Sequence, residues 1–184
     1  YAVWTPDGLG VSEKALGEFV RRRGIRDAVV IATKGGHPDM GADYPRPAAF
    51  LSPEVIARDV DESLERLGVE TIDLYYLHRD VGVTPVGEIL DALAPHVASG
   101  RVRYLGASNW SVERLLEANR WALSHGRPGF VALQNQWSLG VPTWKPTADP
   151  TVRYVTASDL AALDDIAVIP YSATSNGYFA SEGD

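Results

Sequence analysis

The sequence LYYLHRD, residues 74–80, joins a continuous apolar run to a histidine. Together with Ile72 and Asp73, the run has the length and composition of a strand that is buried on both faces. Strands of this kind are typical of parallel sheets covered by helices, and His78 would stand where such a strand ends. The prediction of the fold starts from this stretch.

His78-Arg79-Asp80 is also the tripeptide that opens the catalytic loop of protein kinases. A kinase requires an Asn five residues after the Asp to hold a metal ion, and this chain has Pro85 there. The chain also has no Asp-Phe-Gly sequence. The tripeptide is therefore a coincidence, and His78 has to be explained by its strand.

Helix and strand patterns alternate on both sides of this stretch. Helices are predicted from Ser12, or the residue before it, to Gly24, and over residues 53–67, 85–99, 112–125 and 158–163, with Ser52 and Ser111 as caps. Strands are predicted over residues 28–33, 72–77, 102–107, 130–133 and 166–170. Because parallel strands need crossover connections, this order predicts one α/β domain over residues 1–184.

Composition narrows the possible functions. The chain has 184 residues, of which 45% are hydrophobic and 22% charged, as in ordinary globular proteins. A net charge of -7 without a basic run argues against partners such as nucleic acid or anionic membranes. The sequence shows no signal peptide and no apolar stretch of membrane-spanning length, so a cytoplasmic location is expected. The absence of cysteine excludes disulfides and thiolate chemistry.

Polar side chains follow every predicted strand. They are Lys34, His78, Ser108 with Asn109, Gln134 with Asn135, and Tyr171 with Ser172. The carboxyl ends of parallel strands share one side of the sheet, where ligands bind in barrels and in open sheets. A single strand-end His or Ser is more often structural, but a lysine after a fully apolar run is seldom buried without a task. The sequence therefore predicts one site, with the pKa of Lys34 lowered by burial.

With its flanking residues, this set resembles the aldo-keto reductases. The matching segments are Tyr1, Ser12 to Gly17, Ala32-Thr33-Lys34, Asp73 to His78, Gly106 to Asn109, Gln134 to Leu139, and Pro170-Tyr171-Ser172. The resemblance implies a (β/α)8 barrel of the TIM type, incomplete in this chain, with about strands 3 to 7 present. It also implies hydride transfer between a nicotinamide cofactor and a small-molecule carbonyl or alcohol.

The resemblance implies a role for each site residue. Tyr1 is the expected proton donor, Lys34 the cation that lowers the pKa of its phenol, and His78 the residue that orients the carbonyl. The expected cofactor residues are Ser108, Asn109 and Gln134 on the carboxamide, Tyr171 stacked on the ring, and Ser172. Trp4 and Trp110 are expected to wall an apolar substrate pocket. NADPH is the expected cofactor, with NADH not excluded, and no metal is expected.

The family's fourth catalytic residue is an Asp five positions before the tyrosine, and this sequence begins at the tyrosine. We therefore expect the sequence to be part of a longer protein. His78 is expected to face the substrate, whereas Arg79 and Asp80 are expected to point away into the next loop.

Two other functions are compatible with parts of the pattern. A reductase-like barrel could serve as a nicotinamide-sensing regulatory subunit with negligible turnover, because it could keep all the site residues. A metal-dependent barrel hydrolase could use His37, His78 and Asp80, but the remaining strand ends carry Ser, Asn, Gln and Tyr, which are poorer metal ligands.

Overall fold

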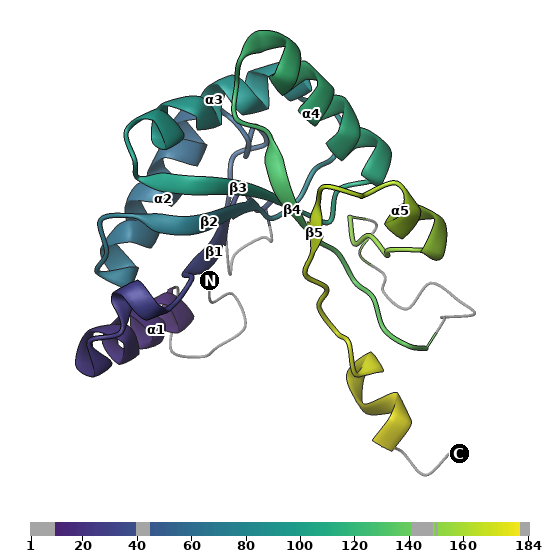
Figure 1. Cartoon of the computed structure of the whole chain (residues 1–184). Coiled ribbons are helices and arrows are strands. Elements are labelled where there is room, and N and C mark those ends of the chain that lie inside the picture. The colour runs from purple at the N-terminus through teal and green to yellow at the C-terminus, as the bar shows by residue number, and fades with distance from the viewer. Residues whose placement is uncertain (1–9, 40–44, 141–148, 150, 181–184) are drawn as a thin grey trace.

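A computed structural model describes residues 10–39, 45–140, 149 and 151–180, and these residues form a parallel α/β structure. The helices are α1 (Val11–Arg23), α2 (Pro53–Leu67), α3 (Val86–Ala98), α4 (Val112–His125) and α5 (Ala157–Ala161), with 3₁₀ helices η1 (Arg26–Ala28) and η3 (Ser175–Ala180). The strands are β1 (Ala32–Gly35), β2 (Ile72–Leu77), β3 (Val102–Ser108), β4 (Phe130–Gln134) and β5 (Ala167–Val168). All adjacent strands pair in parallel, in the order β1-β2-β3-β4-β5 (Figure 1).

The sheet curves, and helices α1 to α4 lie along its outer side (Figure 1). The main core fills the space between these helices and the outer face, which includes Tyr75 and Leu77. A separate small cluster of Leu74, Tyr76 and Ala132 lies on the opposite, concave face. An arc of parallel strands with its helices outside is the architecture of part of a (β/α)8 barrel, so the predicted fold class is confirmed.

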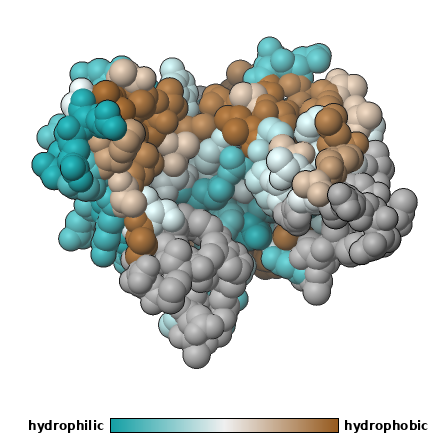
Figure 2. All heavy atoms as spheres, turned by 90° about the horizontal axis from the view of Figure 1, so that it is seen from below, coloured by the Kyte–Doolittle hydropathy of each residue, from teal (hydrophilic) through white to brown (hydrophobic). Residues whose placement is uncertain are grey.

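The view from below shows hydrophilic residues in a hollow between two hydrophobic areas (Figure 2).

Among the described helices, none is both long enough and apolar enough to cross a membrane.

The best-predicted helices are the two with serine caps. Ser52 Oγ accepts a hydrogen bond from Val55 N at the start of α2, and Ser111 Oγ accepts one from Arg114 N at the start of α4. Both helices end at a glycine in the left-handed conformation, as their sequences predicted. Local capping chemistry therefore set these boundaries correctly.

The predicted boundaries of the first helix and strand were wrong. Helix α1 begins at Val11 after Gly10 (φ 79°) with no side-chain cap, so Ser12 is not the cap. Strand β1 begins at Ala32, because η1 occupies the beginning of the predicted run. Val30 precedes β1 and is 76% exposed, and β2 is the described strand that is buried along its whole length. The last helix and strand are also shorter than predicted.

A buried carboxylate fixes the start of β1. Asp73 of β2 accepts a hydrogen bond from Ile31 N at 2.8 Å and forms ion pairs with Arg26 and Arg103. Burial raises the pKa of Asp73, but the hydrogen bonds from Arg26 and Ile31 outweigh it and hold the pKa below its ordinary value. The charged form of Asp73 thus ties β1 and β3 to β2.

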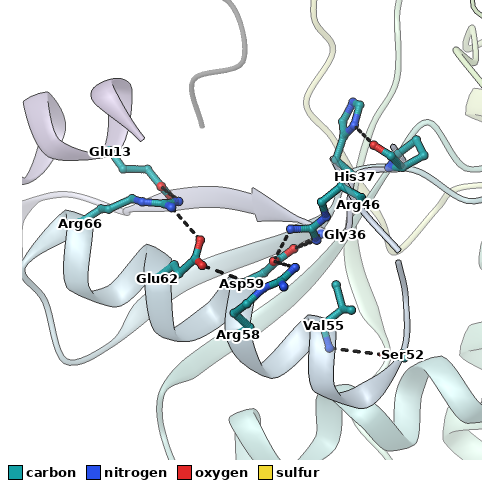
Figure 3. A network of polar contacts seen from close by, with 11 residues as sticks. Glu13, Gly36, His37, Arg46, Ser52, Val55, Arg58, Asp59, Glu62 and Arg66 are labelled. Atoms are coloured by element: carbon teal, nitrogen blue, oxygen red, sulfur yellow. Dashed lines mark hydrogen bonds and ion pairs between the residues drawn. The ribbon is translucent and has the colours of Figure 1, made fainter. Parts of the chain in front are cut away.

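A second buried carboxylate, Asp59 of α2, holds the segment that follows β1 (Figure 3). Its Oδ2 accepts a hydrogen bond from Gly36 N at 2.8 Å. Arg46 pairs with the same carboxylate through both terminal nitrogens, at 2.8 and 2.5 Å, and both side chains are buried. One helix residue thereby anchors two stretches of the loop between β1 and α2.

We expect Asp59→Asn to lower the free energy of unfolding by about 3–5 kcal/mol, because the variant leaves Arg46 buried without its counterion. Urea unfolding measures this change. Glu62→Gln is the matched control: its half-exposed pair with Arg66 contributes less than about 1 kcal/mol. Equal midpoints for the two variants would show that the buried pair does not hold this loop.

Candidate active site

Strand register places Lys34 on the concave face. Lys34 pairs with Tyr76 of β2, and paired residues of neighbouring strands point to the same face. Tyr76 belongs to the concave cluster, whereas its neighbours Tyr75 and Leu77 belong to the main core. Lys34 therefore points away from the helices.

The same alternation brings the other predicted strand-end residues onto this face. His78 lies two residues after Tyr76, and its backbone N–H continues the ladder by donating to Gly35 O at 2.8 Å. Ser108 and Gln134 are register partners at the ends of β3 and β4. The concave face thus carries Lys34, His78, Ser108 and Gln134.

Lys34 is half-buried, and its Nζ lies 5.9 Å from the centre of the Tyr76 ring. Burial lowers the pKa of Lys34 from 10.5 to about 8, and the nearby charge of Arg79 acts in the same direction. The predicted direction of this shift is confirmed. At neutral pH the amine still carries its charge.

His78 is buried beside His37, which the sequence analysis considered only as a possible metal ligand. The ring centroids of His37 and His78 are 4.5 Å apart, with the planes tilted by 53°. His37 Nδ1 lies 2.8 Å from Pro38 O. Burial, together with the charges of Arg79 and Lys34, lowers the pKa of His78 well below 6.5, so its ring is neutral at pH 7. A neutral imidazole still has one N–H group to donate.

Close packing on the concave face depends on Gly106. A Cβ atom at this position would lie 2.5 Å from the Tyr76 ring, which leaves no space for any other residue. Burial raises the pKa of Tyr76 to about 12, and its hydroxyl has no hydrogen-bond partner among the described residues. Tyr76 therefore contributes an apolar ring surface next to Lys34.

Asn109 is the centre of a hydrogen-bond network at the strand ends. Its backbone is left-handed (φ 57°), and its side chain is buried. Asn109 Nδ2 donates to Ser108 Oγ at 3.0 Å and to His78 O at 3.3 Å. Its Oδ1 accepts from Tyr171 Oη at 2.6 Å and from Arg153 N at 3.3 Å. Both amide hydrogens and both acceptor positions are thus already used.

Gln134 differs from Asn109 because its side-chain amide makes no hydrogen bond to the described residues. It is half-buried and lines a pocket of about 210 Å³ that runs along β1 and is also lined by Lys34 and Tyr76. His78 and Arg79 do not line this pocket. Gln134 is therefore the predicted cofactor residue whose amide is available to a ligand.

Tyr171 and Ser172 follow β5. Burial raises the pKa of Tyr171 to about 12, so its hydroxyl stays protonated and donates to Asn109. Ser172 has a left-handed backbone (φ 58°), and its carbonyl oxygen accepts a hydrogen bond from Ser175 N. The structure thus brings Tyr171 to the network and gives Ser172 a turn-forming role.

Arg79 and Asp80 have different partners after the end of β2. Asp80 does turn away, since its carboxylate binds Arg114 of α4 at 3.0 Å and Gly82 N at 3.1 Å. Arg79 donates to His78 O and Thr151 Oγ1, and its charge adds to burial in lowering the pKa of Lys34, His37 and His78. It escaped the sequence analysis because alternation along a strand says nothing of residues beyond the strand's end.

The two predicted tryptophans have different outcomes. Trp110 is fully buried in the main core, with its ring edge-on to Phe130 at 5.0 Å, and Asn135 Nδ2 donates to its carbonyl oxygen. This position gives Trp110 a packing role and does not support a place in a pocket wall. Trp4 and the predicted proton donor Tyr1 lie outside the described residues.

The structure does not favour the metal-dependent hydrolase. Asp80 is bound to Arg114, away from His37 and His78. Residues 10–39, 45–140, 149 and 151–180 contain no group of three or more His, Cys, Asp or Glu side chains arranged to hold a metal ion.

Comparison with known proteins gives consistent similarities. A model of the Aldo/keto reductase family matches residues 1–184. Aldo-keto reductase yakc [NADP(+)] of Schizosaccharomyces pombe is 35% identical over 111 residues, which cover 60% of this chain and 32% of the relative. Aldo-keto reductase str7 of Strobilurus tenacellus is 31% identical over 174 residues, 94% of this chain and 46% of the relative.

L-glyceraldehyde 3-phosphate reductase of Escherichia coli (strain K12) is 31% identical over 153 residues, 82% of this chain and 40% of the relative. The aligned part of the chain thus spans less than half the length of these relatives.

The lowered pKa of Lys34 predicts a pH-dependent stability. Between about pH 8 and 10.5 the unfolded chain binds a proton at this amine that the folded chain has lost, so the free energy of unfolding rises with pH. The cost of burying the charged amine is fully present below pH 8. In urea titrations from about pH 7 to 10, we expect Lys34→Met to lack this rise and Lys14→Met, on the exposed side of α1, to keep it. Parallel curves for the parent and Lys34→Met would contradict the shift.

Proposed function

The chain belongs to the aldo/keto reductase family, and from this premise we propose that it forms part of an oxidoreductase that transfers a hydride between a nicotinamide cofactor and a carbonyl or alcohol. The observation that carries the proposal is that a charged Lys34 and a buried, neutral His78 lie on the same face of the sheet. Carbonyl reduction needs a hydrogen-bond donor on the carbonyl oxygen and an acid that protonates the developing alkoxide.

His78 supplies the donor in this proposal. As a neutral ring it donates one N–H to the carbonyl oxygen, and its depressed pKa keeps it from serving as the acid at neutral pH. The proton then comes from the phenol of Tyr1, with Lys34 as the cation that stabilises the phenolate left behind. Tyrosine is a poor acid at its ordinary pKa near 10, which is why the neighbouring charge matters.

The described residues fit a nicotinamide group. Gln134 has a free amide, Ser108 Oγ keeps one acceptor position, and Tyr171 offers an aromatic face. Asn109 can bind the carboxamide only if it gives up one of its present hydrogen bonds. The carboxamide N–H would have to replace the hydroxyl of Tyr171 or the backbone N–H of Arg153 as a donor to Asn109 Oδ1. When bound, the nicotinamide supplies or accepts the hydride, and the protein's part is to fix its orientation.

We propose NADPH as the cofactor. The support is family membership and one relative named for NADP(+). The proposed substrate is a small carbonyl compound; another relative is named for the reduction of L-glyceraldehyde 3-phosphate. No observation on the described residues favours the nicotinamide-sensing subunit, and turnover of aldehydes by the full-length protein distinguishes the two functions.

We expect Lys34→Met to lower kcat/KM for aldehyde reduction on the order of 10²-fold or more in the full-length protein, the usual contribution of positioned acid-base catalysis. Without the cation the pKa of the phenol rises, so the limb of the pH profile assigned to Tyr1 moves to higher pH. Steady-state rates across pH measure both effects, with Lys14→Met as the control lysine. A rate and pH profile like those of the parent in Lys34→Met would show that Lys34 has only a structural role.

The cofactor site makes a separate prediction about Tyr171. If its ring stacks on the nicotinamide, Tyr171→Phe keeps the face, frees Asn109 Oδ1, and should bind NADPH at least as tightly as the parent. Tyr171→Ala removes the face and should bind roughly tenfold more weakly, because stacked aromatic pairs contribute about 0.5–1.5 kcal/mol beyond area burial. Fluorescence titration measures both dissociation constants. Weaker binding by Tyr171→Phe than by Tyr171→Ala would assign the hydroxyl, and not the ring, to the site.

A further inference from the structure

Arg79 is a buried cation directly after the catalytic-site residue His78. Its side chain is only 9% exposed. Nη1 donates to His78 O at 2.9 Å, and Nε donates to Thr151 Oγ1 at 3.0 Å. These two contacts hold the guanidinium in place with neutral oxygens. Arginine is almost never buried this deeply without an anionic partner.

The anionic partner present is a weak one. Among the described residues, Asp149 is the carboxylate within ion-pair distance of Arg79, and its Oδ2 lies 3.6 Å from Nη2, which is long for a charged pair. The side chain of Asp149 is 42% exposed. Its Oδ1 accepts hydrogen bonds from Thr151 N and Oγ1 at 2.8 and 2.6 Å, so the loop holds this carboxylate independently of Arg79.

The guanidinium therefore keeps unused donors. Of its five N–H groups, one on Nε and one on Nη1 donate to neutral oxygens, and among the described residues Nη2 has only the long contact with Asp149. A planar fork with free donors matches the oxygens of a carboxylate or a phosphate.

Positive charge is also in excess around Arg79. The charges of Arg79 and Lys34 both act on His78, and Arg79 lowers the pKa of Lys34 and His37. Arg46, the other cation that lowers the pKa of His37, is neutralised by its close pair with Asp59. A half-exposed Asp149 balances only part of this charge, so an added anion would be attracted to the strand ends.

We propose that Arg79 binds an anionic group of the substrate, a carboxylate or a phosphate carried a few atoms from the carbonyl, in place of Asp149. The proposal rests on the proposed reductase function, since it names the substrate class of that site. Asp149 can give way at little cost because its contact with Arg79 is long, Thr151 holds it separately, and its side chain is already partly in solvent. Arg79 is thus a specificity residue beside the residue that contacts the carbonyl.

Matched aldehydes test this assignment in the full-length protein. The pairs are 4-oxobutanoate against 4-oxobutanamide, and glyceraldehyde 3-phosphate against glyceraldehyde, so each arm compares an anion with a neutral molecule of related shape. The parent should have a higher kcat/KM for the anion in at least one pair, and the pair that shows it distinguishes carboxylate from phosphate.

Arg79→Met should lower kcat/KM for the preferred anion tenfold or more, mainly through KM, as expected for a lost charged hydrogen bond. The neutral member should lose much less. Arg79→Lys keeps the charge without the fork and should fall between the parent and Arg79→Met. Arg114→Met is the control, because it also removes a buried guanidinium that pairs with a carboxylate after β2; its ratio of anion to neutral should equal that of the parent.

Asp149→Asn makes a prediction of opposite sign. Asparagine keeps an acceptor for Thr151 and removes the competing charge, so KM for the anion should fall. A purely structural Arg79–Asp149 pair predicts instead that both variants lose activity toward both members of a pair. An unchanged ratio in Arg79→Met, or a raised KM for the anion in Asp149→Asn, would overturn the proposal.

A binding measurement separates this proposal from the proposed function. Calorimetry of 4-hydroxybutanoate and glycerol 3-phosphate, the alcohols corresponding to the two anions, needs no turnover. Absence of turnover with every aldehyde would refute the reductase function, while tenfold weaker binding of either alcohol to Arg79→Met would still support the anion site. Binding that is equal in parent and variant would refute the site whatever the turnover.

Discussion

The parallel register of β1 to β4 is the constraint on which the candidate site depends. Because Lys34 pairs with Tyr76 and Ser108 pairs with Gln134, residues far apart in the sequence are forced onto one face at one end of the sheet. A shift of one residue in β1 would turn Lys34 toward the helices and into an apolar core. The pairing of the strands therefore determines which side chains share the site, independently of the contacts that these side chains make with one another.

Two buried carboxylates fix that register at opposite ends of β1. Asp73 binds Ile31 N just before the strand, and Asp59 binds Gly36 N just after it. Between them, Gly35 lets the strand pass so close to Tyr75 that a Cβ atom would lie 1.8 Å from its hydroxyl oxygen. These polar contacts therefore fix the position of β1 at both of its ends.

The sequence predicted what depends on local pattern and failed where long-range contacts decide. Caps such as Ser52, the apolar run of β2 and the polar residues after each strand are local features, and they located the fold and most of the candidate site. The start of β1 depends on Asp73, 42 residues away from Ile31. The burial of Trp110 and the contacts of Arg79 with Thr151 and Asp149 depend equally on partners that no local pattern reveals.

The hydrogen-bond network at Asn109 constrains how any ligand enters. Since its four hydrogen-bonding positions are occupied by Ser108, His78, Tyr171 and Arg153, the network holds the strand ends rigidly without a ligand. A carboxamide that reaches Asn109 exchanges one hydrogen bond for another, and such exchanges contribute little net free energy. The Gln134 amide makes no hydrogen bond to the described residues, so this amide and the ring face of Tyr171 can contact a ligand without giving up a hydrogen bond. In the proposed cofactor site, affinity for the nicotinamide end should therefore come mainly from Gln134 and Tyr171, with Asn109 setting orientation.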